Sequence, residues 1–176
     1  MNLLGRPIDV DLLDVLYEKA NTQQFNLMNE MKQICGFDFK PFSPRDITKI
    51  LYEDLKLPVL KTSKKTGAPS SDKEVLDQLA NINPFPAKLK EYRSLNKFIK
   101  AYILGIGNIV KKVDKLYASF SQVGADSGRF SCPSVTDENQ EDMTVNLQNQ
   151  PKGKSIDIRK AFIAPEDFVV VCCDFS

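Results

Sequence analysis

The segment between Asp9 and Gly36 constrains this chain more than any other, because it predicts one long amphipathic helix. Asp9 is a good N-cap residue, and Gly36 suits the left-handed position that follows a helix. Between them, apolar side chains recur close to helical spacing, at Leu12, Leu16, Ala20, Leu27, Met31 and Ile34. Such a helix has about seven turns, and we interpret it as a helix that packs against a core.

Three further helices are predicted, over residues 43–57, 71–80 and about 86–112. Ser43 caps the first of them, and Pro44 occupies its N1 position. Ser71 and Glu74 form a capping box that starts the second. Gly105 and Gly107 are expected to break or bend the last one.

The character of the chain changes after Leu116. Alternating or continuous apolar runs predict strands over residues 117–123, 156–163 and 168–174. Residues 133–144 are acidic and contain no cation, so they are expected to form a surface or disordered loop. We therefore predict an α+β fold, with an elongated helical part over 1–116 and the rim of an antiparallel sheet over 117–176.

Composition excludes several function classes. The chain has 176 residues and no histidine, which removes histidine-based catalysis and zinc sites built on histidine. Its net charge of +1 means that nucleic-acid binding would depend on local basic clusters. The four cysteines form no CxxC pair, and no signal peptide or membrane-spanning run is visible. We expect a cytoplasmic protein with reduced thiols and no membrane partner.

Three short segments carry the residue types that bind nucleic acids or metals. They contain Arg129 beside Gly128, the polar run from Asn146 to Gln150, and Asp174 at the end of an apolar run. An arginine fork and amide side chains can meet a groove or sugars, and a carboxylate can hold a divalent cation. Taken singly, each segment is more often an ordinary surface turn.

The order and spacing of these segments resemble family A (polymerase I-like) DNA polymerases. The family pattern T-G-R-L-S, N-L-Q-N-I-P, I-R-x-A-F-I-A-P and D-Y-S-Q-I-E is similar to SGRFS, NLQNQP, IRKAFIAP and DFS in this sequence. Upstream, GRPID, KKTGAPSS and EYR resemble the family's thumb. The resemblance covers nearly the whole chain. It implies a thumb over 1–116 and the N-terminal part of the palm over 117–176.

The resemblance also implies functions for individual residues. Asp174 would be the first metal-binding aspartate, and the backbone carbonyl of Phe175 would be a further ligand. They would share two Mg²⁺ ions with residues of a second polypeptide, and these ions would act on a primer end and a deoxynucleoside triphosphate. Arg129 would contact the DNA minor groove. The remaining residues would line or hold the primer–template duplex: Asn146, Gln148 and Asn149 in the palm, and Lys64, Lys65, Ser70 and Ser71 at the thumb tip.

The sequence departs from the family pattern at several points. The segment between Ser131 and Asn146 is longer and more acidic than usual, and Phe130 and Gln150 replace the usual leucine and isoleucine. No residue after Ser176 supplies the fingers or the second metal-binding aspartate, and no exonuclease domain precedes the thumb. We therefore expect an inactive N-terminal piece that needs a second polypeptide with the remaining palm and fingers.

Several alternatives stay open. The chain end fits a split gene, a split intein or a deliberate cut, in a bacterial or phage-infected cell. A rival function is a non-catalytic clamp that binds duplex DNA without a second chain. A third is a plain helical interaction domain that binds no DNA.

Overall fold

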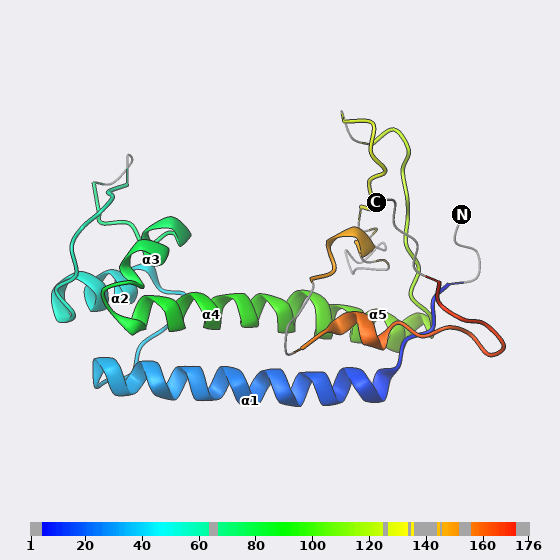
Figure 1. Cartoon of the computed structure of the whole chain (residues 1–176), viewed down its shortest axis with the longest axis horizontal. Helices are drawn as coiled ribbons and strands as arrows, with labels where there is room; N and C mark the ends of the chain where they lie inside the picture. Colours follow the sequence, from blue (N-terminus) through cyan, green and yellow to red (C-terminus); the bar gives the residue numbers. More distant parts are fainter. Residues whose placement is uncertain are drawn as a thin grey trace. The chain divides into compact units, whose positions relative to one another are not determined.

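A computed structural model describes residues 5–63, 67–124, 127–133, 135, 144, 146–151 and 156–171 (Figure 1). The long predicted helix is confirmed as α1, Val10–Cys35. The backbone N–H of Leu12 donates to Asp9 Oδ1 at 2.8 Å, which makes Asp9 the cap. Gly36 ends the helix with a φ of +79°, and its N–H donates to the Lys32 carbonyl at 2.7 Å.

Contacts among the described residues divide the chain into two compact units. Unit 1 comprises residues from 1–20 and 98–176, and unit 2 comprises residues 21–97. Helix α1 contributes its first part to unit 1 and its second part to unit 2. The subdomain boundary expected at residue 116 rests on the sequence and stays a prediction.

Unit 2 is built on α4, Pro84–Phe98, which lies beside the second part of α1 (Figure 1). Side-chain hydrogen bonds join these two helices, from Gln23 to Glu91 at 3.0 Å and from Gln24 to Asn96 at 3.3 Å. The smaller elements are α2 (Pro44–Lys49), the π-helix η1 (Ile50–Asp54) and α3 (Lys73–Leu79). Their shared core contains Met31, Ile47, Ile50, Leu51, Leu57, Val75, Leu76, Leu79, Phe85 and Leu89.

The starts of α2 and α3 test two sequence predictions. Ser43 caps α2 as predicted, because its Oγ accepts from the Asp46 N–H at 3.3 Å. The predicted Ser71–Glu74 capping box is wrong by one residue. Asp72 is the N-cap of α3, and its carboxylate accepts from the Val75 N–H at 3.0 Å. The acidic side chain at 72 supplies the acceptor that a helix start needs, so Ser71 is left outside the helix.

The predicted break at Gly105 and Gly107 does not occur. Helix α4 passes directly into the π-helix η2 (Ile99–Leu104), which continues into α5 (Gly105–Val113). The irregularity is therefore a change of helical type before Gly105. Asp114 ends α5 in the left-handed conformation, with a φ of +61°.

The beginning of unit 1 connects three distant parts of the chain. Arg6 and Leu116 exchange two backbone hydrogen bonds of 2.8 Å. The Asp9 N–H donates to Ala161 O at 2.9 Å, and the Ile163 N–H donates to Pro7 O at 3.3 Å. These pairs form isolated bridges and do not extend into strands.

The predicted sheet rim is not confirmed, because the described residues contain helices and isolated bridges but no strand. The strand predicted over 156–163 is wrong at its centre, where Ile158–Ala161 is a 3₁₀ helix, η4. Asp157 caps this turn by accepting from the Arg159 N–H at 3.2 Å, a local bond that competes with extended pairing. Residues 172–174 of the last predicted strand lie outside the described residues, as does most of the acidic loop. None of the described helices combines the length and apolar character needed to cross a bilayer.

Candidate nucleic-acid interface

A narrow loop connects η1 to α3 at one end of unit 2. Its two sides are joined by backbone hydrogen bonds of 2.8 Å, from the Ser63 N–H to Ala68 O and from the Ser70 N–H to Lys61 O. Gly67 allows the turn with a φ of +68°. Lys64 and Lys65, two predicted phosphate ligands, lie outside the described residues, between the described Ser63 and Gly67.

An ion-pair cluster fixes the base of this loop. Lys61 Nζ lies 2.7 Å from Asp72 Oδ2 and 3.2 Å from Glu74 Oε2. The hydrogen bond from Lys61, together with the Val75 N–H, lowers the pKa of Asp72 from 3.8 to about 2. The same two carboxylates raise the pKa of Lys61. Lys61 is therefore engaged at the base of the loop.

A groove of about 700 Å³ runs between this loop and α2. One wall comes from the loop and contains Ser63, Ala68, Pro69, Ser70 and Ser71. The other wall comes from α2 and η1 and contains Pro44, Arg45, Thr48, Lys49 and Glu53. The structure thus places the predicted pair Ser70 and Ser71 beside two basic residues.

Sequence reasoning missed Arg45 and Lys49. Both are exposed, and they lie four residues apart on one face of α2. Lys49 Nζ also lies 5.7 Å from the centre of the Phe37 ring. The four-residue spacing of two cations after the Ser43 cap is the signal that could have identified them.

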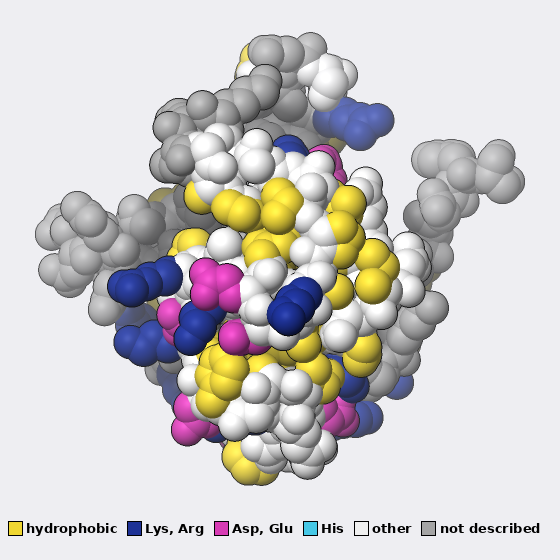
Figure 2. Space-filling model, turned by 90° about the vertical axis from the view of Figure 1, so that its left-hand side faces the viewer, with side chains coloured by type: hydrophobic (Ala, Val, Ile, Leu, Met, Phe, Trp, Pro, Cys, Tyr) yellow, Lys and Arg dark blue, Asp and Glu magenta, His cyan; other side chains and the backbone are white. Residues whose placement is uncertain are grey.

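The charged side chains at this end of unit 2 form a small group. Figure 2 shows basic and acidic side chains grouped together, with hydrophobic side chains above and below the group. Exposed apolar residues of unit 2 include Phe37, Phe42, Val59, Leu60 and Ile82. A binding surface here would therefore rest on a few cations inside the groove.

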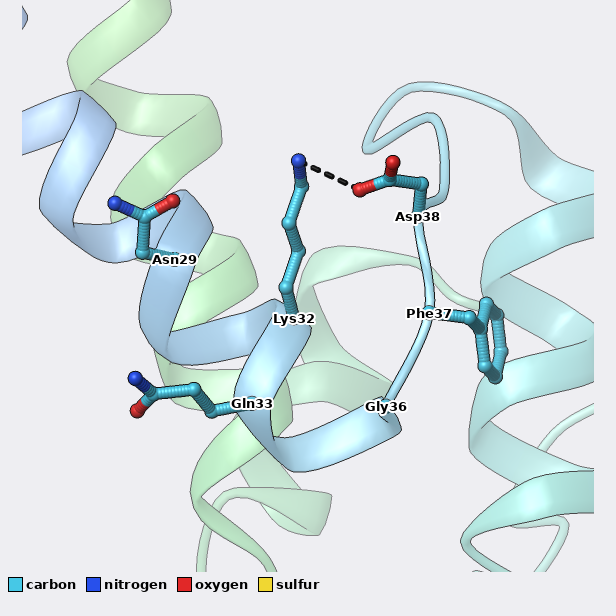
Figure 3. Close-up of a pocket in the computed structure, with 6 residues that line it drawn as sticks. All are labelled: Asn29, Lys32, Gln33, Gly36, Phe37 and Asp38. Atoms are coloured by element: carbon cyan, nitrogen blue, oxygen red, sulfur yellow. Dashed lines mark ion pairs between the residues drawn. The ribbon is translucent and has the colours of Figure 1, made fainter.

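A second hollow, of about 550 Å³, lies at the C-terminal end of α1 (Figure 3). Lys32 and Asp38 point toward each other across it, and their ion pair measures 2.6 Å. The other lining residues are Asn29, Gln33, Gly36 and Phe37. Because a carboxylate already pairs with the cation, this hollow suits a phosphate less well than the groove beside α2.

Two predicted DNA-binding segments meet in unit 1. The Gln148 side chain donates from Nε2 to the Phe130 carbonyl at 2.7 Å, which joins the SGRFS and NLQNQP motifs. Asn146 caps the 3₁₀ helix η3 (Leu147–Asn149), since its side chain accepts from the Gln148 N–H at 3.0 Å. Predicted residues from both motifs are thus brought together.

Arg129 lies on a turn held by paired serines. Ser121 and Ser131 exchange backbone hydrogen bonds of 2.8 and 2.9 Å. Gly128 next to Arg129 has a φ of +70°, and a Cβ atom there would meet nothing within 4 Å. Arg129 is exposed, and within the described part of the chain no hydrogen bond or ion pair engages its side chain.

The predicted magnesium ligands, Asp174 and Phe175, lie outside the described residues. Within the described ranges, no cluster of three metal-ligating side chains occurs. The apolar run before Asp174 is described only as far as Val171, and it is exposed. Phe168, Val169, Val170 and Val171 are 70%, 83%, 58% and 74% accessible.

Comparison with known proteins agrees with the motifs. The chain is 29% identical to DNA polymerase I of Deinococcus radiodurans, over 100% of its own length and 18% of the relative's. It is 30% identical to DNA polymerase I of Helicobacter pylori, over 99% of its own length and 19% of the relative's. The chain therefore spans about a fifth of the curated relatives that it matches.

A solved structure shares the fold. The POL domain of Pol1 from M. smegmatis, in complex with DNA primer-template and dNTP, superposes with a TM-score of 0.74 at 23% identity. The match covers 94% of this chain and 28% of that one. The profile of DNA polymerase family A matches residues 10–176. The chain belongs to DNA polymerase family A.

Proposed function

We propose that this chain forms the DNA-gripping thumb (1–116) and the first edge of the palm (117–176) of a template-directed DNA polymerase. Family membership supports the reaction class. The observation that carries the proposal is the groove in which Arg45 and Lys49 lie across from Ser70 and Ser71.

The groove offers three kinds of phosphate ligand. A guanidinium binds phosphate oxygens with two parallel N–H donors, an ammonium binds them as a point charge, and serine hydroxyls donate single hydrogen bonds. Lys64 and Lys65, which follow Ser63 in the sequence, would add two more cations. Such contacts hold the DNA backbone whatever its sequence, and they weaken with salt because counterions are released.

The palm edge would contact the duplex through Arg129, Asn146, Gln148 and Asn149. Every base pair presents hydrogen-bond acceptors in the minor groove, so donors there can test duplex shape without reading sequence. The Gln148–Phe130 hydrogen bond would keep Arg129 beside the amide side chains of Asn146, Gln148 and Asn149. A polymerase that copies any template requires this kind of contact.

Magnesium chemistry would involve Asp174 and Phe175. A carboxylate and a backbone carbonyl are oxygen ligands of the kind that Mg²⁺ prefers, so their chemistry fits the ion. Two bound ions would stabilise the attacking and leaving oxygens when a deoxynucleoside triphosphate is joined to the primer. A second carboxylate and the triphosphate-binding groups would come from the remaining palm and fingers.

The first test is duplex binding by the 176-residue chain. We expect a labelled primer–template duplex to bind at low salt. The logarithm of the binding constant should fall linearly with the logarithm of the salt concentration. Arg45→Ala and Lys49→Ala should each weaken binding and reduce that slope by about 1. Lys32→Ala is the matched control, because Lys32 pairs with Asp38 outside the groove. A chain that binds no duplex at low salt would instead be a helical interaction domain.

The second test is complementation. We expect primer extension when the chain is mixed with a polypeptide containing the remaining palm and fingers, and we expect Asp174→Ala to abolish it. A mixture that stays inert, while this chain alone binds duplex in a salt-dependent manner, would support the non-catalytic clamp.

A further inference from the structure

Two consecutive carbonyls before α3 are held by side chains from other elements. The Tyr52 hydroxyl, on η1, donates to the Ser70 carbonyl at 2.5 Å. Arg93, on α4, donates from Nη1 to the Ser71 carbonyl across a long contact of 3.5 Å. Ser70 and Ser71 also line the groove beside α2. The backbone of this wall is therefore attached to two helices other than α3.

Arg93 also binds the segment that leads into the opposite wall. Its Nε donates to the Pro41 carbonyl at 2.9 Å, three residues before Pro44 opens α2. A guanidinium carries only donors, arranged in one rigid plane, so it can set the spacing of two carbonyls. Arg93 is half-buried, and this burial lowers the pKa of its guanidinium. The same side chain thus bonds one wall of the groove and the segment that precedes the other wall.

Arg93 and Tyr52 are held in place by the packing of the residues next to them. Tyr92, next to Arg93, packs its ring against Phe42, with centroids 6.1 Å apart. Ile50 and Leu51, next to Tyr52, are fully buried in the unit 2 core. Tyr52 and Arg93 therefore project from anchored helices, as is needed to orient a loop.

We infer that Arg93 and Tyr52 are positioning residues that fix the two walls of the groove, with Arg93 tying Pro41 to Ser71 and Tyr52 holding Ser70. The inference rests on the proposed function in one respect, that the groove binds DNA phosphates. Neither side chain needs to touch DNA. Each side chain acts by holding the loop wall that contains Ser70 and Ser71. Loss of either side chain should misplace these two serines relative to Arg45.

Hydrogen exchange of the backbone amides tests the positioning without DNA. Tyr52→Phe removes only the hydroxyl, and Arg93→Lys keeps the charge but loses the planar fork. We expect both variants to speed exchange at least fivefold at Ser70 and Val75, whose N–H groups are bonded at the loop base, and to leave α1 unchanged. Tyr92→Phe is the matched control and should change neither. Unchanged exchange at Ser70 and Val75 in both variants would overturn the inference.

Duplex binding tests whether the positioning matters for function. We expect Arg93→Lys to weaken primer–template binding about tenfold, the loss of roughly one charge-assisted hydrogen bond. When Ser70 and Ser71 are both alanine, Arg93→Lys should cost no further affinity, because its effect passes through them. An undiminished tenfold loss in that background would mean a merely structural role and would overturn the inference.

The salt slope separates positioning from direct contact. Arg93→Met should weaken binding with the slope unchanged, whereas a residue that contacts a phosphate would reduce the slope by about 1. A reduced slope would overturn the inference. If Arg93→Met does not fold, the decisive comparison is Arg93→Lys measured with and without alanine at Ser70 and Ser71. A wild-type chain that binds no duplex would contradict the proposed function alone, and amide exchange would still decide whether the two residues position the loop.

Discussion

Single carboxylates and hydroxyls determine where the helices of this chain begin. Asp9, Ser43 and Asp72 each accept a backbone N–H from the first turn of a helix. These groups satisfy donors that would otherwise lack an intrahelical partner. Their substitution therefore has effects that can be stated in advance.

Removal of the α1 cap should destabilise the fold measurably. We expect Asp9→Ala to lower the free energy of unfolding by about 1 kcal/mol, the usual cost of losing a side-chain cap. Asp9→Asn, which keeps an acceptor oxygen, should cost much less. Urea denaturation followed by circular dichroism would measure the difference, and equal losses in the two variants would contradict the capping role.

Asp72 should make the loop base sensitive to acid. Its pKa is lowered in the folded chain from 3.8 to about 2, so its stabilising effect is complete above pH 4 and is lost as the pH falls toward 2. Loop signals in NMR spectra should therefore change over that window. Asp72→Asn should remove the change, because an amide does not titrate in this range. A titration midpoint near 3.8 in the wild-type chain would show that Lys61 and the cap do not act on Asp72.

At the scale of elements, the main irregularity is the use of π-helical turns within or after α-helices. Both η1 and η2 follow an α-helix without a break, and Leu55 donates to Ile50 O at 2.9 Å in the five-residue pattern. π-turns are rare and are often found near functional sites. In unit 2, η1 supplies Tyr52, which holds the wall of the groove.

The two kinds of glycine in unit 1 should respond in opposite ways to alanine. A Cβ at Gly107, within α5, would meet nothing within 4 Å. We expect Gly107→Ala to stabilise the chain by about 0.5–1 kcal/mol through helix propensity. Gly5→Ala should destabilise it, since Gly5 has a φ of +61° and its Cβ would lie 2.8 Å from Lys115 Cβ. Thermal unfolding of both variants is the measurement, and shifts in the same direction would disagree with this prediction.

The sequence predicted features that depend on neighbours in the chain. The Asp9 and Ser43 caps and the Gly36 end are local, and all three are confirmed. The strand over 156–163 was wrong because Ile158 and Ala161 are buried at a spacing of three, which suits a 3₁₀ turn. A prediction from strand propensity does not consider that the Asp157 side chain can cap a turn.

The groove could be predicted only in part. Ser70 and Ser71 were identified through the family motif, whereas Arg45 and Lys49 were not. Their proximity depends on how η1 and the loop return toward α2, which follows from tertiary packing. Asp174, Phe175, Lys64 and Lys65 lie outside the described residues, so their functions stay predictions.

At the scale of the whole molecule, stability depends on the buried apolar side chains that both units contain. Among the described residues, every fully buried side chain in the core is apolar, and no charged group is buried. Each unit therefore depends mainly on removing apolar surface from water. Among the exposed apolar residues, Phe168 to Val171 form a continuous run of four.

That run should make the isolated chain self-associate. Contiguous exposed apolar residues with high strand propensity are prone to pairing between molecules. We expect Val169→Lys combined with Val171→Lys to shift the chain toward monomer in size-exclusion chromatography with light scattering. Phe25→Lys is the matched control, because Phe25 is a singly exposed residue, 66% accessible on α1. A wild-type chain that is already monomeric at high concentration would refute the prediction.

The π-helix η2 also has a consequence for chain length. A π-turn contains one residue more than the α-turn it replaces, so a single-residue deletion within Ile99–Leu104 can be absorbed by a return to ordinary helical winding. The same deletion inside α5 would rotate Ile106, Ile109 and Val110 away from their buried positions by about 100°. Insertions and deletions in related sequences should therefore accumulate at η2 and be rare in the helix that follows it.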